Sequence, residues 1–346
     1  MKVLINNKEF QLTDINKFGG EGDLYTVDYL GEKKCVKIYN PEKRTPFNEK
    51  KIFILINKFK RISFDGIENH LGYPELPVYD SNKKFCGFMM KYFGNHSQVS
   101  ELKFSNNHYN YGNTELHDED VFKLCDNLFF YLKILHKAGI ILGDVNPENI
   151  LIDKTNLTPC IVDFDSVQVG SFYSSSYRKE YIDPSVRVDG NGKHKYFIYT
   201  TDSDIYSLAT IFYELVVGPK PHFYTTTDPT DTFYKKSIDL SFLDFYLDNT
   251  DKIKEHNYQL QEDKDFVAYK ERLQYLQEFY PNIFNYLKSI FSEGKRYYFY
   301  YKQNRPVNIH KKDGVLEFNE VELITQSKED PDELELFMKQ FELRIP

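Results

Sequence analysis

The sequence of 346 residues has no tryptophan, few cysteines and no long apolar run. Its four cysteines, Cys35, Cys86, Cys125 and Cys160, lack the paired short spacings of zinc or redox sites and lie in apolar segments, so buried thiols are expected. Because no stretch of about 18 uncharged apolar residues occurs, we expect no membrane-spanning helix and no membrane partner. Met1–Phe10 alternates like a strand where a signal peptide would carry a continuous apolar core, which favours a cytoplasmic location.

Positive charge is also in short supply. The 44 Lys and Arg residues against 52 Asp and Glu give a formal net charge of -8, which argues against a protein that follows a nucleic-acid backbone. What is present is the balance of a globular protein, with 41% hydrophobic and 28% charged residues. The length is enough for one large domain or two modest ones.

The pattern of apolar residues changes near Tyr92. Before it, short alternating segments predict strands, interrupted by one helix that begins at Thr45–Pro46 and runs to Phe59. After it, apolar residues three and four apart predict an amphipathic helix over 119–137, and a second helix is expected over 203–217, capped by Thr201 or Asp202. The expected strands are Val3–Ile5, Phe10–Leu12, Leu24–Val27, Cys35–Tyr39, Leu76–Tyr79 and Phe85–Met90.

These elements predict an α+β protein with a small β-rich lobe followed by a larger helical lobe. We place the first lobe at residues 1–92, the second at 93–312, and a C-terminal tail at 313–346. The tail is expected to contain a short strand over 315–318 and a helix over 330–341, and to dock back onto the rest of the chain.

Five chemically suggestive features follow one another, and the first two lie in the β-rich lobe. Gly19–Gly22, between two predicted strands, lets the backbone fold over a ligand, although a plain β-turn explains such a cluster taken alone. Lys37 faces the same side of its strand as Cys35, so its ammonium needs an anion there. Glu49, 49 - 37 = 12 positions later in the first turn of the following helix, can supply one; a solvated surface pair is the alternative.

The other three features lie in the helical lobe. Asp144 and Asn149 form an Asp-x4-Asn loop between a predicted helix and strand, a pattern typical of a carboxylate that accepts a proton from a hydroxyl and an amide that holds a metal. Asp163 follows an apolar strand, where a second metal-binding carboxylate is expected. Asp204 lies in the first turn of an apolar helix and is expected to bond the backbone of the Asp144 loop.

In this order the features resemble the signature motifs of protein kinases, over about residues 10–310. The resemblance implies a two-lobed protein-kinase-like fold, ATP and Mg2+ as cofactors, and transfer of the γ-phosphate to Ser/Thr hydroxyls of a protein substrate, autophosphorylation included. The loop Gly-Gly-Glu-Gly, the strand Lys-Ile-Tyr and the segments Gly-Asp-x-Asn-Pro and Asp-x-Asp-Ser are similar to a divergent bacterial branch of eukaryotic-like Ser/Thr kinases. That similarity adds a PP2C-type phosphatase as a partner.

Carried over by position, the resemblance assigns a role to each matched residue. Asp144 is the catalytic aspartate, Lys37 the lysine that pairs with the α- and β-phosphates, and Glu49 its helix partner. Asn149 and Asp163 are the metal ligands. The residues expected around the nucleotide are Gly19, Gly20, Gly22, Leu24, Cys35, Lys37, Met90 and Leu151.

The sequence departs from the kinase pattern at several positions. Leu142–Gly143 stands in place of His-Arg, so the arginine that reads a phosphorylated activation loop is missing. Asn146 replaces a lysine that steadies the γ-phosphate, and Asp165 replaces a glycine and adds a carboxylate to the metal segment. Ser185 replaces the glutamate of the Ala-Pro-Glu element, which leaves its expected partner, Arg305, to find another acceptor.

The same residues are compatible with two other functions. A small-molecule phosphotransferase of the aminoglycoside or choline kinase type shares the Asp144 and Asn149 loop, although Asp204–Ala209 and Arg305–Pro306 resemble protein kinases. A nucleotide-binding pseudokinase scaffold would explain Asn146, although such a scaffold needs no proton acceptor beside two metal ligands.

Overall fold

The computed structural model describes residues 1–18, 20–61, 66–105, 108–111, 114–178, 180–183, 185–189, 196–217, 263–291, 296, 298–299, 301, 309–312 and 315–318. The chain divides into two units, residues 1–301 and 302–346. In the second unit the strands β18 (Ile309–Lys312) and β19 (Val315–Phe318) form an antiparallel hairpin. The predicted strand over 315–318 is therefore confirmed, whereas the predicted tail helix and Arg305 lie outside the described residues.

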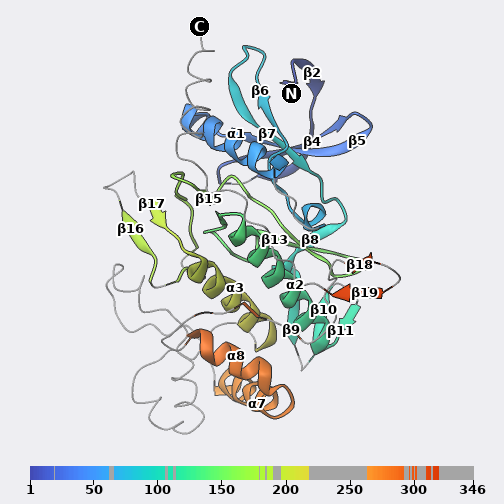
Figure 1. Ribbon diagram of the computed structural model, residues 1–346, viewed down its shortest axis with the longest axis vertical. Coiled ribbons are helices and arrows are strands. Elements are labelled where there is room, and N and C mark those ends of the chain that lie inside the picture. Colours follow the sequence, from blue (N-terminus) through green and yellow to red (C-terminus); the bar gives the residue numbers. More distant parts are fainter. Residues whose placement is uncertain are drawn as a thin grey trace. The chain divides into compact units, whose positions relative to one another are not determined.

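The N-terminal part of the first unit is a seven-stranded antiparallel sheet with the order β2-β1-β6-β7-β5-β4-β3 (Figure 1). All six predicted strands are confirmed, while the apolar pattern misses β3, whose segment TDINKF has only two apolar residues. The strands are β1 (Lys2–Ile5), β2 (Lys8–Gln11), β3 (Thr13–Phe18), β4 (Gly22–Tyr29), β5 (Glu32–Tyr39), β6 (Leu76–Tyr79) and β7 (Phe85–Lys91).

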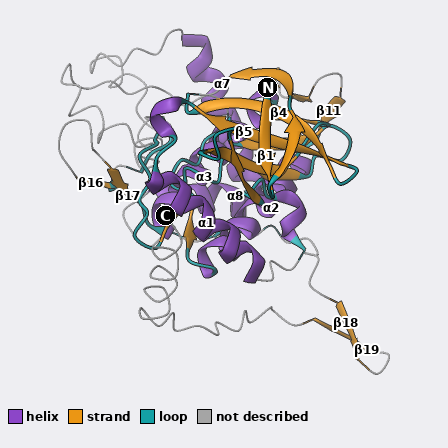
Figure 2. Ribbon diagram, turned by 90° about the horizontal axis from the view of Figure 1, so that it is seen from above, coloured by secondary structure: helices purple, strands orange, loops and turns teal. Residues whose placement is uncertain are grey.

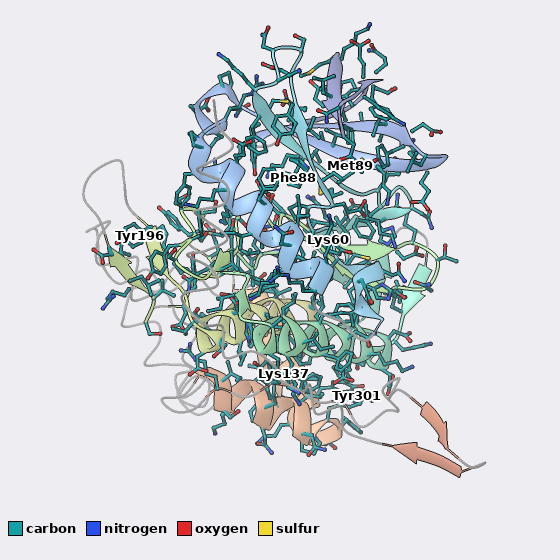
Figure 3. All side chains as sticks on the ribbon, turned by 45° about the horizontal axis from the view of Figure 1, so that its top comes forward. Lys60, Phe88, Met89, Lys137, Tyr196 and Tyr301 are labelled. Atoms are coloured by element: carbon teal, nitrogen blue, oxygen red, sulfur yellow. The ribbon has the colours of Figure 1, made fainter. Side chains whose placement is uncertain are left out.

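Helix α1 (Pro46–Arg61) covers one face of this sheet and contacts β6 and β7 (Figure 1). Thr45 caps it as predicted, because its hydroxyl oxygen accepts a hydrogen bond from the Asn48 amide at 3.2 Å. Alternation along β7 sends Phe88 into the apolar cluster shared with α1 and Met89 into a separate cluster on the other face (Figure 3). The face that carries Phe88 is therefore the one directed at the rest of the first unit.

Among the described residues, four helices build the second half of the first unit: α2 (Asp118–Lys137), α3 (Thr201–Val216), α7 (Asp263–Phe279) and α8 (Pro281–Phe291). Helix α3 contacts both α2 and α8, and α7 contacts α8, so α3 is the central helix (Figures 1 and 2). The two helices predicted over 119–137 and 203–217 are confirmed. The cap of α3 is Thr200, since its hydroxyl accepts from the Ser203 amide at 3.1 Å; the expected cap at Thr201 or Asp202 was wrong, because the helix begins earlier.

Short strands connect these helices and carry the loops described below. They are β8 (His96–Gln98), β9 (Lys103–Ser105), β10 (His108–Tyr111), β11 (Thr114–Leu116), β12 (Ile140–Ile141), β13 (Ile150–Asp153), β14 (Pro159–Ile161), β15 (Gln168–Val169), β16 (Arg187–Asp189) and β17 (Tyr196–Ile198). One apolar cluster runs from β5 and α1 through α2 and α3 to α8 and includes Phe88, Phe129 and Phe212, each fully buried. All four cysteines are buried and free, as predicted. None of the described helices combines the length and apolarity that crossing a bilayer requires.

Candidate active site

The loop between β12 and β13 holds Asp144 in a fixed place. Gly143 has a φ of +75°, and a Cβ there would lie 2.8 Å from the ring of Tyr199, so the loop turns where only glycine fits. The side-chain amides of Asn146 and Asn149 both donate to the Asp144 carbonyl oxygen, at 3.1 and 3.0 Å. Asn146 also donates to Asp144 Oδ1 at 3.1 Å. Both amides therefore hold the backbone of Asp144, and that of Asn146 also bonds its carboxylate.

The carboxylate of Asp144 is partly removed from water. Burial raises its pKa to about 6, the hydrogen bond from Asn146 opposes that rise, and the negative charge of Asp163 adds to it. A carboxylate with this pKa is ionised at neutral pH and accepts a proton more readily than an ordinary aspartate does. Asn146, which replaces a lysine in the kinase pattern, acts here by hydrogen bonding to Asp144.

Asp163 lies beside Lys37 at the end of the apolar segment that follows β14. Its backbone takes a φ of +67°, and the Lys37 Nζ lies 2.7 Å from its Oδ1. Burial would raise the pKa of Asp163, but the charge and hydrogen bond of Lys37 outweigh that effect and hold the pKa below its usual value. The next residue, Phe164, is fully buried and packs edge-on against Phe59 of α1, with ring centroids 5.4 Å apart. This packing fixes the backbone that presents Asp163.

Lys37 is buried on β5, where β7 approaches so closely that a Cβ at Gly87 would lie 2.0 Å from the Lys37 carbonyl oxygen. Desolvation would lower the pKa of Lys37, but the charges of Asp165 and Asp163 raise it above its ordinary value. The predicted pairing with Glu49 is wrong in this structure. Lys37 Nζ instead contacts Asp163 at 2.7 Å and Asp165 at 2.9 Å.

Glu49 is hydrogen bonded elsewhere. Its side chain accepts from the hydroxyl of Tyr79 on β6, and burial raises its pKa. The reason is its place in the first turn of α1, because the residues that this helix buries begin two positions later, at Lys51. Sequence spacing alone gave no information on which residue of the helix faces Lys37.

The residues expected around a nucleotide divide into two groups. Gly20, Gly22, Leu24 and Cys35 belong to the β-sheet part, while Gly19 lies outside the described residues. Gly20 has open space where a Cβ would be, whereas a Cβ at Gly22 would lie 2.3 Å from the Ile38 carbonyl oxygen. Gly22 is thus required by the close approach of β4 and β5.

The register of the strands places the other residues of the sheet group opposite one another. Leu24 on β4 is opposite Lys37 on β5, and Cys35 is opposite Met90 on β7. Cys35 and Met90 are buried in one cluster, and Leu24 packs against it. Leu151 lies on β13 in a different sheet, with the order β14-β13-β8.

A cavity brings the predicted metal ligands together with Asp144. Asp144, Asn149 and Asp163 all line it, beside apolar residues of α2 and of the loop. Among the described residues no three His, Cys, Asp or Glu side chains form a metal cluster. The oxygen donors of Asn149 and Asp163 suit Mg2+, which takes few protein ligands and completes its shell with phosphate oxygens and water.

Asp204 anchors the Asp144 loop to helix α3, as predicted. Its Oδ2 accepts from the Leu142 amide at 2.6 Å and its Oδ1 from the Gly143 amide at 2.8 Å. His136 of α2 adds a third contact, with its Nε2 2.9 Å from Asp204 Oδ2, and its Nδ1 lies 2.8 Å from the hydroxyl of Tyr298. The sequence pattern gave no sign of this histidine.

Two arginines complete the surroundings of the loop. Arg296 forms an ion pair with buried Asp183, two residues before Ser185, the position where the kinase pattern has its glutamate. Arg178 forms an ion pair with Glu148 of the Asp144 loop. The segment after Asp163 is therefore joined to the catalytic loop without any phosphate group.

Lys51 of α1 is the other buried cation of the site. Only 5% of it is exposed, and no ion pair or hydrogen bond joins its ammonium to another described residue. Desolvation lowers its pKa from 10.5 to about 8, although the charges of Asp165, Glu21 and Asp163 oppose the change. A charged lysine without a direct partner is a cost to the folded state.

Replacing Lys51 by methionine is expected to stabilise the protein. The pKa is lower in the folded chain, so the penalty is fully present below about pH 8 and fades as pH rises toward the unfolded value of 10.5. The free energy of unfolding at pH 7 should rise by up to roughly 3 kcal/mol. Denaturant unfolding at pH 7 and pH 10 measures the gain and its loss. Lys50→Met, at the exposed neighbouring position, is the control, and an equal gain in both variants would contradict the explanation.

Comparison with known proteins places these features in context. A family model described as "Protein kinase domain" matches residues 26–285. "Serine/threonine-protein kinase PKH2" of Candida albicans is 25% identical over 252 residues, which are 66% of this chain and 24% of that protein. "Serine/threonine-protein kinase sck2" of Schizosaccharomyces pombe is 32% identical over 117 residues, or 32% of this chain and 16% of that protein. The matched regions span about a quarter or less of these relatives.

Proposed function

The chain belongs to the protein kinase family, and on that premise we propose that it is an ATP-dependent Ser/Thr kinase that acts on a protein substrate. The observation that carries the proposal is the convergence of Asp144, Asn149 and Asp163 on one cavity, with Lys37 2.7 Å from Asp163. The sheet and the helices of the first unit are the two lobes of the kinase fold.

Within this proposal each residue of the site takes the role that the kinase pattern gives it. Asp144 accepts the proton of the substrate hydroxyl, held in place by Asn146. Lys37 holds the α- and β-phosphates, and Asn149 and Asp163 hold Mg2+ through oxygen atoms. The metal, when bound, neutralises the charge of the phosphates.

The nucleotide itself would lie against the sheet. Gly19, Gly20 and Gly22 belong to the loop proposed to cover its phosphates. Its base would lie between Leu24 and Cys35 on one side and Leu151 on the other, next to Met90. The pairing of Cys35 with Met90 and of Leu24 with Lys37 supports the first half of that arrangement.

Finer proposals rest on sequence resemblance. They are autophosphorylation, a PP2C-type phosphatase as partner and membership of a bacterial branch of the family; a cytoplasmic location is proposed from the apolar pattern of the sequence instead. The two relatives named above are fungal, so the bacterial branch is supported only by the four motif segments that resemble it.

Transfer of labelled phosphate from ATP with Mg2+ tests the proposal. The protein should label itself or a generic protein substrate, and should label neither choline nor an aminoglycoside. Nucleotide binding without any transfer would instead support a pseudokinase scaffold.

We expect the kinase to work without phosphorylation of the segment after Asp163. Leu142–Gly143 offers no arginine to bind a phosphate, and the ion pair of Arg178 with Glu148 already holds the segment. Protein treated with a broad-specificity phosphatase should therefore keep its initial rate within about twofold. Arg178→Gln, in contrast, should lower the rate. A rate that collapses on dephosphorylation and returns on autophosphorylation would refute this expectation.

A further inference from the structure

Asp165 occupies the position at which the kinase pattern has a glycine, and its carboxylate lies deep in the site. Only 2% of its side chain is exposed, compared with 28% for Asp163. The Lys37 Nζ lies 2.9 Å from Asp165 Oδ2 and 3.0 Å from Oδ1, so both carboxylate oxygens face the ammonium. Lys37, itself buried, thus has two aspartates as counter-ions.

The surroundings of Asp165 hold its carboxylate in place. The hydroxyl of Tyr39 donates to it, and Tyr39 lies two residues after Lys37 on the same face of β5. Lys51 of α1 is a further buried cation, whose ammonium is attracted by Asp165. Asp165 therefore lies beside the ammonium of Lys37 and the hydroxyl of Tyr39, and the charge of Lys37 partly offsets the cost of burying its carboxylate.

We propose that Asp165 is the positioning residue for Lys37, in place of a glutamate from α1. The inference rests on the proposed function, in which Lys37 holds nucleotide phosphates. Asp163 is also the proposed metal ligand, so without Asp165 the long lysine side chain would have no counter-ion of its own and would be ordered in part by the nucleotide, at a cost in conformational entropy. Asp165 orders the side chain in advance.

In this arrangement the two aspartates have different roles. A metal ligand must be open to the phosphates and to water, which suits Asp163 with its larger exposure and its place on the cavity wall. Asp165 does not line that cavity, and both its oxygens face Lys37. Asp163 is thus the proposed Mg2+ ligand, and Asp165 the residue that positions Lys37.

Binding of ADP in the presence of EDTA separates the two roles, because a metal ligand is irrelevant when no metal is present. Kd can be measured with a fluorescent ADP analogue for the wild type, Asp165→Asn, Lys37→Met and the double variant. Asp165→Asn should raise Kd by about tenfold, the effect of one charge-assisted hydrogen bond. It should add little in the Lys37→Met background, since there is then no lysine to position.

Two further variants show whether a change in Kd comes from misfolding or from a general loss of negative charge. Tyr39→Phe keeps the ring and removes only the hydroxyl that holds Asp165, so it should raise Kd in the same direction by a smaller factor. Asp28→Asn is the matched control, because this exposed aspartate caps the turn at Gly31 through an oxygen that asparagine retains. Its Kd should be that of the wild type.

The outcomes are distinct. An unchanged or tighter Kd for Asp165→Asn, or an effect that persists in full without Lys37, overturns the positioning role. A normal Kd in EDTA combined with a raised Mg2+ requirement would make Asp165 a metal ligand instead. Failure of the wild type to bind ADP at all would refute the proposed function, and would be visible before any variant is compared.

Discussion

Asp144→Asn is expected to lower kcat by about 10²- to 10⁴-fold while leaving the Kd for ADP unchanged, since the substitution removes the proton acceptor and nothing else. The asparagine has the same shape, and its oxygen can still accept the hydrogen bond that Asn146 donates. The loop is also held from its backbone, through Asp204 and the amide of Asn149. The loss should therefore appear in the chemical step.

The pH profile gives this prediction a second readout. Burial raises the pKa of Asp144 to about 6, and only the ionised carboxylate accepts a proton. The kcat/KM of the wild type should therefore fall as pH decreases through 6, and the residual activity of Asp144→Asn should lack that decline. Asp153→Asn, whose half-buried side chain caps the turn at Thr155 and Asn156 and lies 3.8 Å from His96, is the control and should behave as the wild type. A variant at position 144 that retains more than about a tenth of the rate would exclude Asp144 as the base.

The parts of this site that sequence reasoning located are those set by local structure. Asp144 and Asn149 share a short loop, so their spacing fixes their mutual position whatever the rest of the chain does. Asp204 lies in the first turn of an almost wholly buried helix, where a carboxylate must find amide donors. The strands and helices that carry them have strong apolar periodicity, and their predicted ranges agree with the structure within a few residues.

The parts that sequence reasoning missed depend on the orientation of one element against another. Whether Glu49 or Lys51 faces Lys37 is decided by the rotation of α1 about its axis, which packing against β6 and β7 determines. The contact of His136 with Asp204 likewise depends on how α2 packs against α3, because the two residues lie on different helices. The pairing of Arg296 with Asp183 joins residues 296 - 183 = 113 positions apart, with no local signal at either end.

Asp204→Ala is expected to destabilise the protein by about 3–5 kcal/mol and to lower Tm by about 10 °C, the largest effect on stability that we predict. Asp204 is fully buried, and its two oxygens accept from the amides of Leu142 and Gly143 at 2.6 and 2.8 Å. Alanine leaves both amides without their acceptor and also removes the partner of His136. Water cannot easily replace that acceptor at a buried position.

A graded pair of variants tests whether the loop amides are the reason. Asp204→Asn keeps one acceptor oxygen but places an NH2 group against the second amide, so its loss of stability should be smaller than that of the alanine variant. Asp202→Ala, at an exposed position of the same helical turn, should change stability by no more than about 1 kcal/mol. At temperatures where Asp204→Asn stays folded, its kcat should still fall. The side chain at position 204 no longer binds both loop amides, so the loop no longer holds the neighbouring Asp144 in its position. Equal losses for alanine and asparagine with normal kcat in the latter would mean that Asp204 stabilises helix packing and not the catalytic loop.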